Sequence, residues 1–306
     1  MQKNKEYINC PFCGHDDNKH YYSHNQWKVV KCKKCNHIYT NPIPKQNSIK
    51  NLYNKNYFET EERFNRGFKN VDYSNSFLKN IQEIENYFSK RGKLLEIGCA
   101  YGDFLYIMHK RGWDVTGIDI SQTSIKDGKE KYNIDLKCTT IEKFETNEKY
   151  DVICLYQCLE HLTDPNYAIK KCFSLLKTNG ILIIEVPNLN SFDAKISKKR
   201  FLWNLDLPYH LSHFTPKFLS KKLKENKFEI IKIDLYHPNF ILKLASTLKN
   251  KKNILAGNHD SKNQNSSKIE NELLMEKLNS SYKNKLINFI SIFFPGWRFT
   301  IISKKK

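Results

Sequence analysis

The fold of this chain is decided by one stretch, which reads Lys93-Leu-Leu-Glu-Ile-Gly-Cys-Ala-Tyr-Gly-Asp103. Leu94, Leu95 and Ile97 make a short apolar run that is typical of a buried parallel strand. Gly98 and Gly102 then allow a turn in which the backbone can approach a ligand closely. The free N–H groups at the start of the helix predicted over 103–110 face the same ligand position. We therefore expect a ligand cradle, although many strand–turn–helix units with two glycines have no such role.

A second predicted strand, 113–119, ends in an acid about twenty residues after the glycine turn, which is where a doubly wound fold places a carboxylate against ribose hydroxyls. Asp119 is thus a candidate ribose ligand. The plainer alternative is that it is the acid at a helix N-terminus, just ahead of Ser121.

The rest of the chain alternates between predicted strands and helices, which favours a doubly wound α/β fold. Further strands are expected at 134–138, 150–155, 181–188, 228–235 and 297–303, and helices at 77–89, 121–132, 166–177 and 215–225. Asn179 and Gly180 are expected to end the helix over 166–177.

Several motifs resemble those of class I S-adenosylmethionine (SAM) methyltransferases. Glu-x-Gly-Cys-x-x-Gly at 96–102 is similar to their motif I, and Leu-Glu-His-Leu at 159–162 followed by Asp-Pro is similar to small-molecule members of the family. The chain has neither the Asp/Asn-Pro-Pro-Tyr motif of adenine-amine methyltransferases nor the Pro-Cys pair of cytosine-C5 enzymes. The resemblance covers 10–235 and the last strand. It implies a seven-stranded, Rossmann-like sheet whose last strand inserts antiparallel.

The same resemblance implies that SAM is the cofactor and indicates which residues hold it. Glu96, Gly98 and Gly102 would bind the methionine end and Asp119 the ribose. The other implied cofactor contacts are Tyr57 (which would reach over SAM unless it is an ordinary packing aromatic), Cys99, Ile120, Ile141 (against the adenine) and Gln157.

Two histidines are candidate bases. His161 follows a strand at the carboxyl edge, where open α/β sheets bind ligands, and an imidazole with an unperturbed pKa of about 6.5 suits proton removal at neutral pH. Holding a loop by hydrogen bonds is an equally good interpretation of His161. His210 lies in a His-Leu-Ser-x-Phe segment that resembles the one over the substrate pocket of sugar C-methyltransferases, where a histidine helped by a tyrosine acts as base.

Tyr209, the third candidate catalytic residue, stands where the sugar C-methyltransferases carry Glu. Because of this departure, the resemblance does not assign C-methylation, and the acceptor atom stays open among oxygen, nitrogen and carbon. His210 and His213 are spaced three apart, but we do not expect a metal there because no acid accompanies them at ligand spacing.

Two Cys-x-x-Cys pairs precede the fold, and eighteen residues separate them: Cys10, Cys13, Cys32 and Cys35. Four thiolates predict a tetrahedral zinc site without an open position, so the zinc would be structural. We expect a zinc ribbon over 1–45 ahead of a methyltransferase domain over 46–306, which contains a helical or loop insertion at 236–296. This order resembles bacterial sugar and small-molecule methyltransferases.

Lys and Arg number 51 against 32 Asp and Glu, a net charge of +19. This charge suits an anionic small substrate or RNA. The predicted function is methyl transfer to a small molecule such as a nucleotide sugar or surface-glycan precursor. The alternative is an RNA methyltransferase that uses the ribbon and the lysines. The cysteine pattern and the lack of a signal core or bilayer-length apolar run favour the cytoplasm. The insertion suggests a lid or a homodimer contact, with docking to a membrane surface as the alternative.

Overall fold

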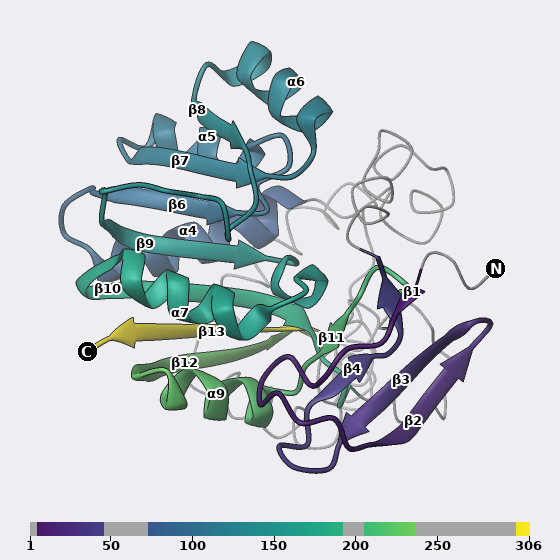
Figure 1. Ribbon diagram of the computed structural model, residues 1–306. Coiled ribbons are helices and arrows are strands. Elements are labelled where there is room, and N and C mark those ends of the chain that lie inside the picture. The colour runs from purple at the N-terminus through teal and green to yellow at the C-terminus, as the bar shows by residue number, and fades with distance from the viewer. Residues whose placement is uncertain (1–4, 46–72, 192–204, 237–297) are drawn as a thin grey trace, which may run out of the picture.

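The computed structural model describes residues 5–45, 73–191, 205–236 and 298–306 (Figure 1). Tyr57 and nearly all of the insertion expected at 236–296 lie outside these residues, so the cofactor contact and the lid or homodimer contact expected there stay predictions. Among the described residues, no helix combines the length and apolarity needed to span a membrane.

A seven-stranded sheet forms the centre of the molecule, as the sequence predicts. Its strands, in spatial order, are β12 (Phe228–Tyr236), β13 (Arg298–Lys305), β10 (Leu176–Pro187), β9 (Tyr150–Tyr156), β6 (Lys93–Ile97), β7 (Asp114–Asp119) and β8 (Asp135–Cys138). β13 pairs antiparallel with both β10 and β12, and the other neighbours pair in parallel. The Rossmann-like fold with an inserted antiparallel last strand is therefore confirmed.

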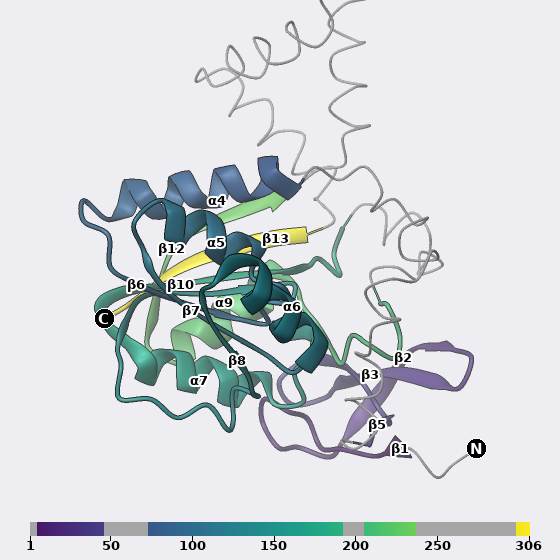
Figure 2. The same ribbon diagram turned by 90° about the horizontal axis from the view of Figure 1, so that it is seen from above.

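Helices cover both faces of this sheet (Figure 2). One face carries α4 (Tyr73–Tyr87), α5 (Asp103–Lys110) and α6 (Gln122–Tyr132), and the other carries α7 (Pro165–Leu175) and α9 (Pro216–Glu225). Successive side chains of a strand point to opposite faces of the sheet, so each strand contributes to both layers. Leu94 packs with the first set of helices and Leu95 with the second. The helices start at capping residues: Asp164, Ser121 and Thr215 accept hydrogen bonds from the first turns of α7, α6 and α9.

The predicted end of α7 is wrong. The helix ends at Leu175, and β10 already begins at Leu176, which pairs with Tyr150 of β9. Leu175 and Leu176 are both buried, so the chain leaves the helix to place both side chains in the core. Asn179 has a φ of 65° and lies in the irregular stretch before the ladder resumes at Ile181, so it bends a strand and does not end a helix.

The N-terminal residues form small sheets at the end of the central sheet toward which β6, β7 and β9 point (Figure 1). β1 (Lys5–Glu6) pairs with β5 (Ile43–Pro44), and a four-stranded sheet has the order β11 (Ser212–His213), β4 (Ile38–Thr40), β3 (Trp27–Cys32) and β2 (Asn18–His24). Because β11 comes from the segment that follows His210, the expected ribbon is joined to that segment by backbone pairing.

Aromatic packing strengthens this junction. The Phe12 ring lies 4.7 Å from His37 and 5.2 Å from Phe218 of α9, and 6.2 Å from Phe214. Phe12 and Tyr39 belong to the same hydrophobic cluster as Leu95 and Leu182 of the large sheet. The N-terminal residues and this face of the large sheet thus share one core. The boundary expected near residue 45 stays a prediction.

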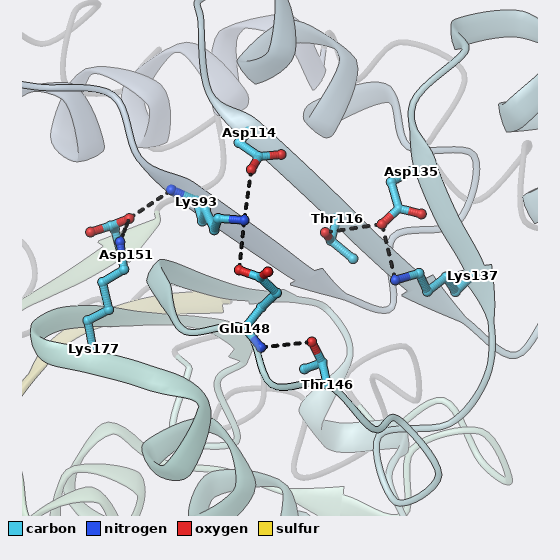
Figure 3. Close-up of polar contacts among 9 residues, drawn as sticks. All are labelled: Lys93, Asp114, Thr116, Asp135, Lys137, Thr146, Glu148, Asp151 and Lys177. Carbon is cyan, nitrogen blue, oxygen red and sulfur yellow. Dashed lines mark hydrogen bonds and ion pairs between the residues drawn. The ribbon is translucent and has the colours of Figure 1, made fainter.

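A polar hollow lies at the amino-terminal ends of β6, β7 and β9, at the end of the sheet away from the small N-terminal sheets (Figure 3). Lys93 Nζ lies 3.2 Å from Asp114 and 2.7 Å from Glu148, and Asp151 accepts from the Lys93 amide and pairs with Lys177 at 2.8 Å. Exposed pairs of this kind contribute little stability. Because its charges are matched within the protein, we interpret this edge as structural.

We expect Leu95→Ala to lower the free energy of unfolding by about 2–5 kcal/mol, because Leu95 is fully buried in β6, an interior strand of the sheet, and the change leaves a cavity. The matched change Leu78→Ala, at an exposed position of α4, should shift it by no more than about 0.5 kcal/mol. Urea unfolding measures both. Equal effects would contradict the placement of the core.

Candidate functional site

The turn between β6 and α5 has two glycines whose backbone φ angles are positive, a conformation that favours glycine. Gly98 and Gly102 have φ angles of 78° and 81°, in the left-handed region. A Cβ on Gly98 would also lie 2.6 Å from the Cys158 sulfur. The turn therefore lies directly against the segment that follows β9.

Asp119, at the end of β7, supports this turn. Its Oδ2 accepts a hydrogen bond from the Ala100 amide at 2.9 Å and its Oδ1 accepts one from the Ser121 amide at 2.8 Å. Burial raises the pKa of Asp119, while these amides lower it. Each carboxylate oxygen has a second lone pair, so Asp119 can hold the turn and still accept from a ribose hydroxyl.

Glu96 is the buried acid beside the turn. It is 5 % exposed, and its Oε2 has no hydrogen-bond partner among the described residues. Burial, followed by the charges of Asp119 and Asp103, raises its pKa well above the usual value. A buried carboxylate oxygen without a donor fits a ligand that brings a donor or a positive charge, such as the amino group of the SAM methionine end.

Gln157 follows β9 at the same edge of the sheet and is held by a buried network. Its Nε2 donates to Glu185 Oε1 at 3.3 Å, and its amide donates to the Glu185 carbonyl at 2.9 Å. Arg298 lies 3.1 Å from the same carboxylate, and Thr300 donates to its other oxygen at 3.1 Å. Glu185 and Arg298 were not among the predicted site residues, although a single acid inside the apolar run of β10 is a signal by which Glu185 could be found.

The other predicted cofactor residues lie around the turn and the β7–β8 edge. Cys99 and Ile141 are buried, and Ile120 is half-buried beside Asp119. Ile141 is only 2 % exposed and belongs to the core with Ile97 and Ile118, so it offers little surface to an adenine ring in this structure.

The second part of the site begins at the short helix η2 (Leu159–His161), after Cys158. His161 Nδ1 lies 3.0 Å from the Tyr209 carbonyl oxygen, and the His161 and His210 rings are 4.8 Å apart between centroids. Both candidate bases therefore come together, and Tyr209 contributes a backbone oxygen to the arrangement. Two acids lie near His210: Glu160, which forms a group with His161 and His210 within 4.8 Å, and Asp206, whose Oδ2 lies 4.0 Å from His210 Nε2. The expectation that no acid accompanies this histidine is therefore wrong.

The small sheet supports the His210 segment from behind. Thr40 Oγ1 donates to the His210 carbonyl at 2.8 Å, and the Thr40 amide donates to the Leu211 carbonyl. The hydroxyl proton of Thr40 is thus used, so His213 Nε2, 3.2 Å from Thr40 Oγ1, is the donor in that contact. Burial lowers the pKa of His213 well below its usual value, which keeps this ring neutral.

The four predicted metal-binding cysteines also meet. Cys10 and Cys35 sulfurs are 3.4 Å apart, Cys13 and Cys32 sulfurs are 3.5 Å apart, and all four lie within 4.8 Å of one another. Sulfurs at 2.3 Å around one tetrahedral zinc are separated by roughly 3.8 Å. The set therefore fits a zinc site with four cysteine ligands.

Comparison with known proteins identifies the fold and the family. A family profile described as "Methyltransferase domain" matches residues 69–233. The crystal structure of a SAM dependent methyltransferase from Archaeoglobus fulgidus is similar with a TM-score of 0.52 and 23% sequence identity, over 81% of this chain and 99% of that one.

Curated relatives share part of the chain. A ubiquinone biosynthesis O-methyltransferase of Bradyrhizobium diazoefficiens is 30% identical over 148 residues, which is 45% of this chain and 58% of that protein. One of Actinobacillus pleuropneumoniae is 37% identical over 137 residues, 40% of this chain and 58% of that protein. The match thus spans less than two thirds of these relatives.

Because the profile spans more than half of the 306 residues, the chain belongs to the class I SAM-dependent methyltransferase family, as the sequence motifs predict. The resemblance seen at 96–102 and 159–165 is confirmed.

Gly128 of α6 gives a test of the turn. A Cβ there would collide with the Tyr101 carbonyl oxygen inside the glycine turn. Gly→Ala in a helix normally stabilises by roughly 0.5–1 kcal/mol, but we expect Gly128→Ala to destabilise by about 1–3 kcal/mol and to weaken binding of S-adenosylhomocysteine.

Thr123→Ala, at an exposed position of the same helix, is the matched control. Thermal unfolding and calorimetric titration measure stability and binding. A Gly128→Ala protein as stable as wild type, with equal affinity, would show that α6 does not support the turn.

Proposed function

We propose that this chain transfers the methyl group of SAM to an oxygen of a small molecule. The observation that carries the proposal is that the glycine turn and the histidine pair adjoin. Gly98 lies against Cys158, and the Cys158 carbonyl accepts from the His161 amide at 2.9 Å. If SAM binds at the glycine turn, an acceptor molecule next to its methyl group would therefore lie beside the two histidines.

On the cofactor side, Glu96 would bind the ammonium group of the methionine end of SAM. Gly98 and Gly102, which have no side chains, would leave space for that end, and Asp119 would bind the ribose. Glu96 supports this through its unpaired buried oxygen, and Asp119 through its remaining lone pairs. We propose Tyr57, Cys99, Ile120 and Gln157 as the surrounding contacts, and Ile141 as a further contact whose buried side chain must become more exposed to reach the adenine.

SAM supplies an electrophilic methyl group on a positive sulfur. In the proposed reaction a lone pair of the acceptor oxygen forms the bond to the methyl carbon, the carbon–sulfur bond breaks in line, and its electron pair goes to sulfur. The acceptor's proton must also leave. The chain therefore contributes alignment and help with proton loss.

We propose that His161 and His210 promote this proton loss and that Tyr209 positions His161. Nδ1 of His161 faces a carbonyl oxygen, which can only accept, so Nδ1 carries the proton and Nε2 keeps its lone pair. His210 is 7 % exposed, so its ring is held in one place by the surrounding packing.

The acceptor class rests on three supports. The partial relatives are O-methyltransferases by name. Tyr209 replaces the Glu expected for sugar C-methylation, which favours oxygen over carbon. The N-terminal cysteines, the His-Leu-Ser-x-Phe segment and the net charge of +19 support an anionic, nucleotide-linked sugar or glycan precursor.

The direct test is to incubate the purified protein with methyl-labelled SAM and an extract of its source cells, and to fractionate the label. We expect label in small anionic metabolites, stable to the conditions that cleave methyl esters. Label in RNA, which the alternative from the sequence predicts, would contradict the proposal.

With the acceptor in hand, His210→Ala should lower turnover about 100-fold or more, because help with proton transfer typically contributes that much. Affinity for S-adenosylhomocysteine should stay unchanged. His109→Gln, at an exposed position of α5, should have wild-type turnover. Wild-type turnover in His210→Ala would remove His210 from the mechanism.

We propose that Cys10, Cys13, Cys32 and Cys35 hold one structural zinc ion. Cys13→Ser should lower zinc content well below one per chain and increase proteolysis between residues 5 and 45, because a structural zinc stabilises its fold directly. The exposed Cys138 of β8 provides the control, and Cys138→Ser should keep full zinc. Equal zinc in both variants, measured by elemental analysis, would contradict the assignment.

A further inference from the structure

Glu160 is a buried acid that the cofactor side does not use. The residue is 1 % exposed, and neither carboxylate oxygen has a hydrogen-bond partner among the described residues. An isolated buried carboxylate is costly unless a donor or a positive charge compensates it. Its carboxylate is aimed at the histidines, with Oε1 3.9 Å from His161 Nε2.

His161 is prepared to act as a ligand through Nε2. Its Nδ1–H donates to the Tyr209 carbonyl, which leaves the Nε2 lone pair directed toward Glu160. Metal-binding histidines commonly donate their other ring N–H to a carbonyl in this way, because the bond fixes the tautomer and the ring orientation.

His210 completes the group from a distant part of the chain. One ligand atom from each of Glu160, His161 and His210 lies within 4.8 Å of the others. The Leu211 amide donates to the Glu160 carbonyl at 2.8 Å, so the two segments are joined by their backbones at this point. Two imidazoles and one carboxylate are the donors that first-row transition metals take in open three-ligand sites.

We infer that Glu160, His161 and His210 bind one divalent first-row transition-metal cation beside the methyl-transfer site. Ligand atoms at about 2.1 Å from such an ion are roughly 3–3.5 Å apart, so binding requires the group to contract by about 1 Å. The charge of the cation compensates Glu160, and two neutral imidazoles complete the protein ligands.

The role of this cation in methyl transfer rests on the function proposed above, whereas its binding does not. Three protein ligands leave positions open for an acceptor hydroxyl and a neighbouring oxygen of the same molecule. A hydroxyl bound to a divalent cation loses its proton more readily. The proton passes to solvent water, the oxygen lone pair forms the bond to the methyl carbon, and the carbon–sulfur bond's electrons go to sulfur. The site therefore favours acceptors with adjacent oxygen atoms.

The test is titration of the zinc-loaded, full-length protein with Mn²⁺, followed by electron paramagnetic resonance of the free ion. Mn²⁺ is a suitable probe because cysteine thiolates select softer metals. We expect one Mn²⁺ per chain in wild type and in His109→Gln, and an affinity at least about tenfold weaker in Glu160→Gln. Equal Mn²⁺ affinity in wild type and Glu160→Gln, or no binding in wild type, would overturn the inference.

His210→Gln is a second variant, which keeps the test decisive if Glu160→Gln fails to fold, and it should lose Mn²⁺ affinity to a similar degree. Titration with S-adenosylhomocysteine separates the two proposals. Binding of S-adenosylhomocysteine without Mn²⁺ binding overturns the cation site and leaves the methyltransferase proposal standing. Mn²⁺ binding without S-adenosylhomocysteine binding supports the cation site and contradicts the methyltransferase proposal.

Discussion

A carboxylate taken out of water must be compensated, and four carboxylates near the carboxyl edge of the central sheet meet this constraint in different ways. Glu185 is compensated within the protein by Arg298 and by hydrogen bonds from Thr300 and Gln157. Asp119 receives two backbone amides. Glu96 and Glu160 each have at least one buried oxygen without a hydrogen-bond partner among the described residues. The difference separates acids that hold the structure from acids that we assign to ligands.

The small N-terminal sheet bears on the candidate site because it is hydrogen-bonded to the His210 segment. β4 pairs with β11, Thr40 bonds the His210 carbonyl, and the Leu211 amide bonds the Glu160 carbonyl. Hydrogen bonds from the backbone and from the Thr40 hydroxyl thus connect the sheet that carries the cysteine cluster with the histidine pair. A structural zinc would stabilise one end of this connection. A closed four-cysteine site of the kind proposed would thus support the histidine segment without taking part in the chemistry.

Local patterns in the sequence predicted much of this architecture. The apolar run and glycines of 93–103 predicted strand β6 and its turn. Asp119 lies beside that turn, and the four cysteines lie together, as their spacing indicates. The features that the sequence did not predict depend on tertiary contacts between residues far apart in the chain. Glu160 and His210 are fifty residues apart and meet where the Leu211 amide donates to the Glu160 carbonyl, which spacing along the chain cannot show. The pair Glu185–Arg298 joins strands far apart in sequence, and the start of β10 at Leu176 depends on burial against β9.

A crystal structure of the protein with S-adenosylhomocysteine and Mn²⁺, with anomalous data to locate the ion, examines both ligand assignments at once. We expect the ammonium of S-adenosylhomocysteine within hydrogen-bonding distance of Glu96, its ribose on Asp119, and an anomalous peak at Glu160, His161 and His210. A structure in which Glu96 and Glu160 are both paired with protein side chains, with the ligands elsewhere, would contradict both assignments.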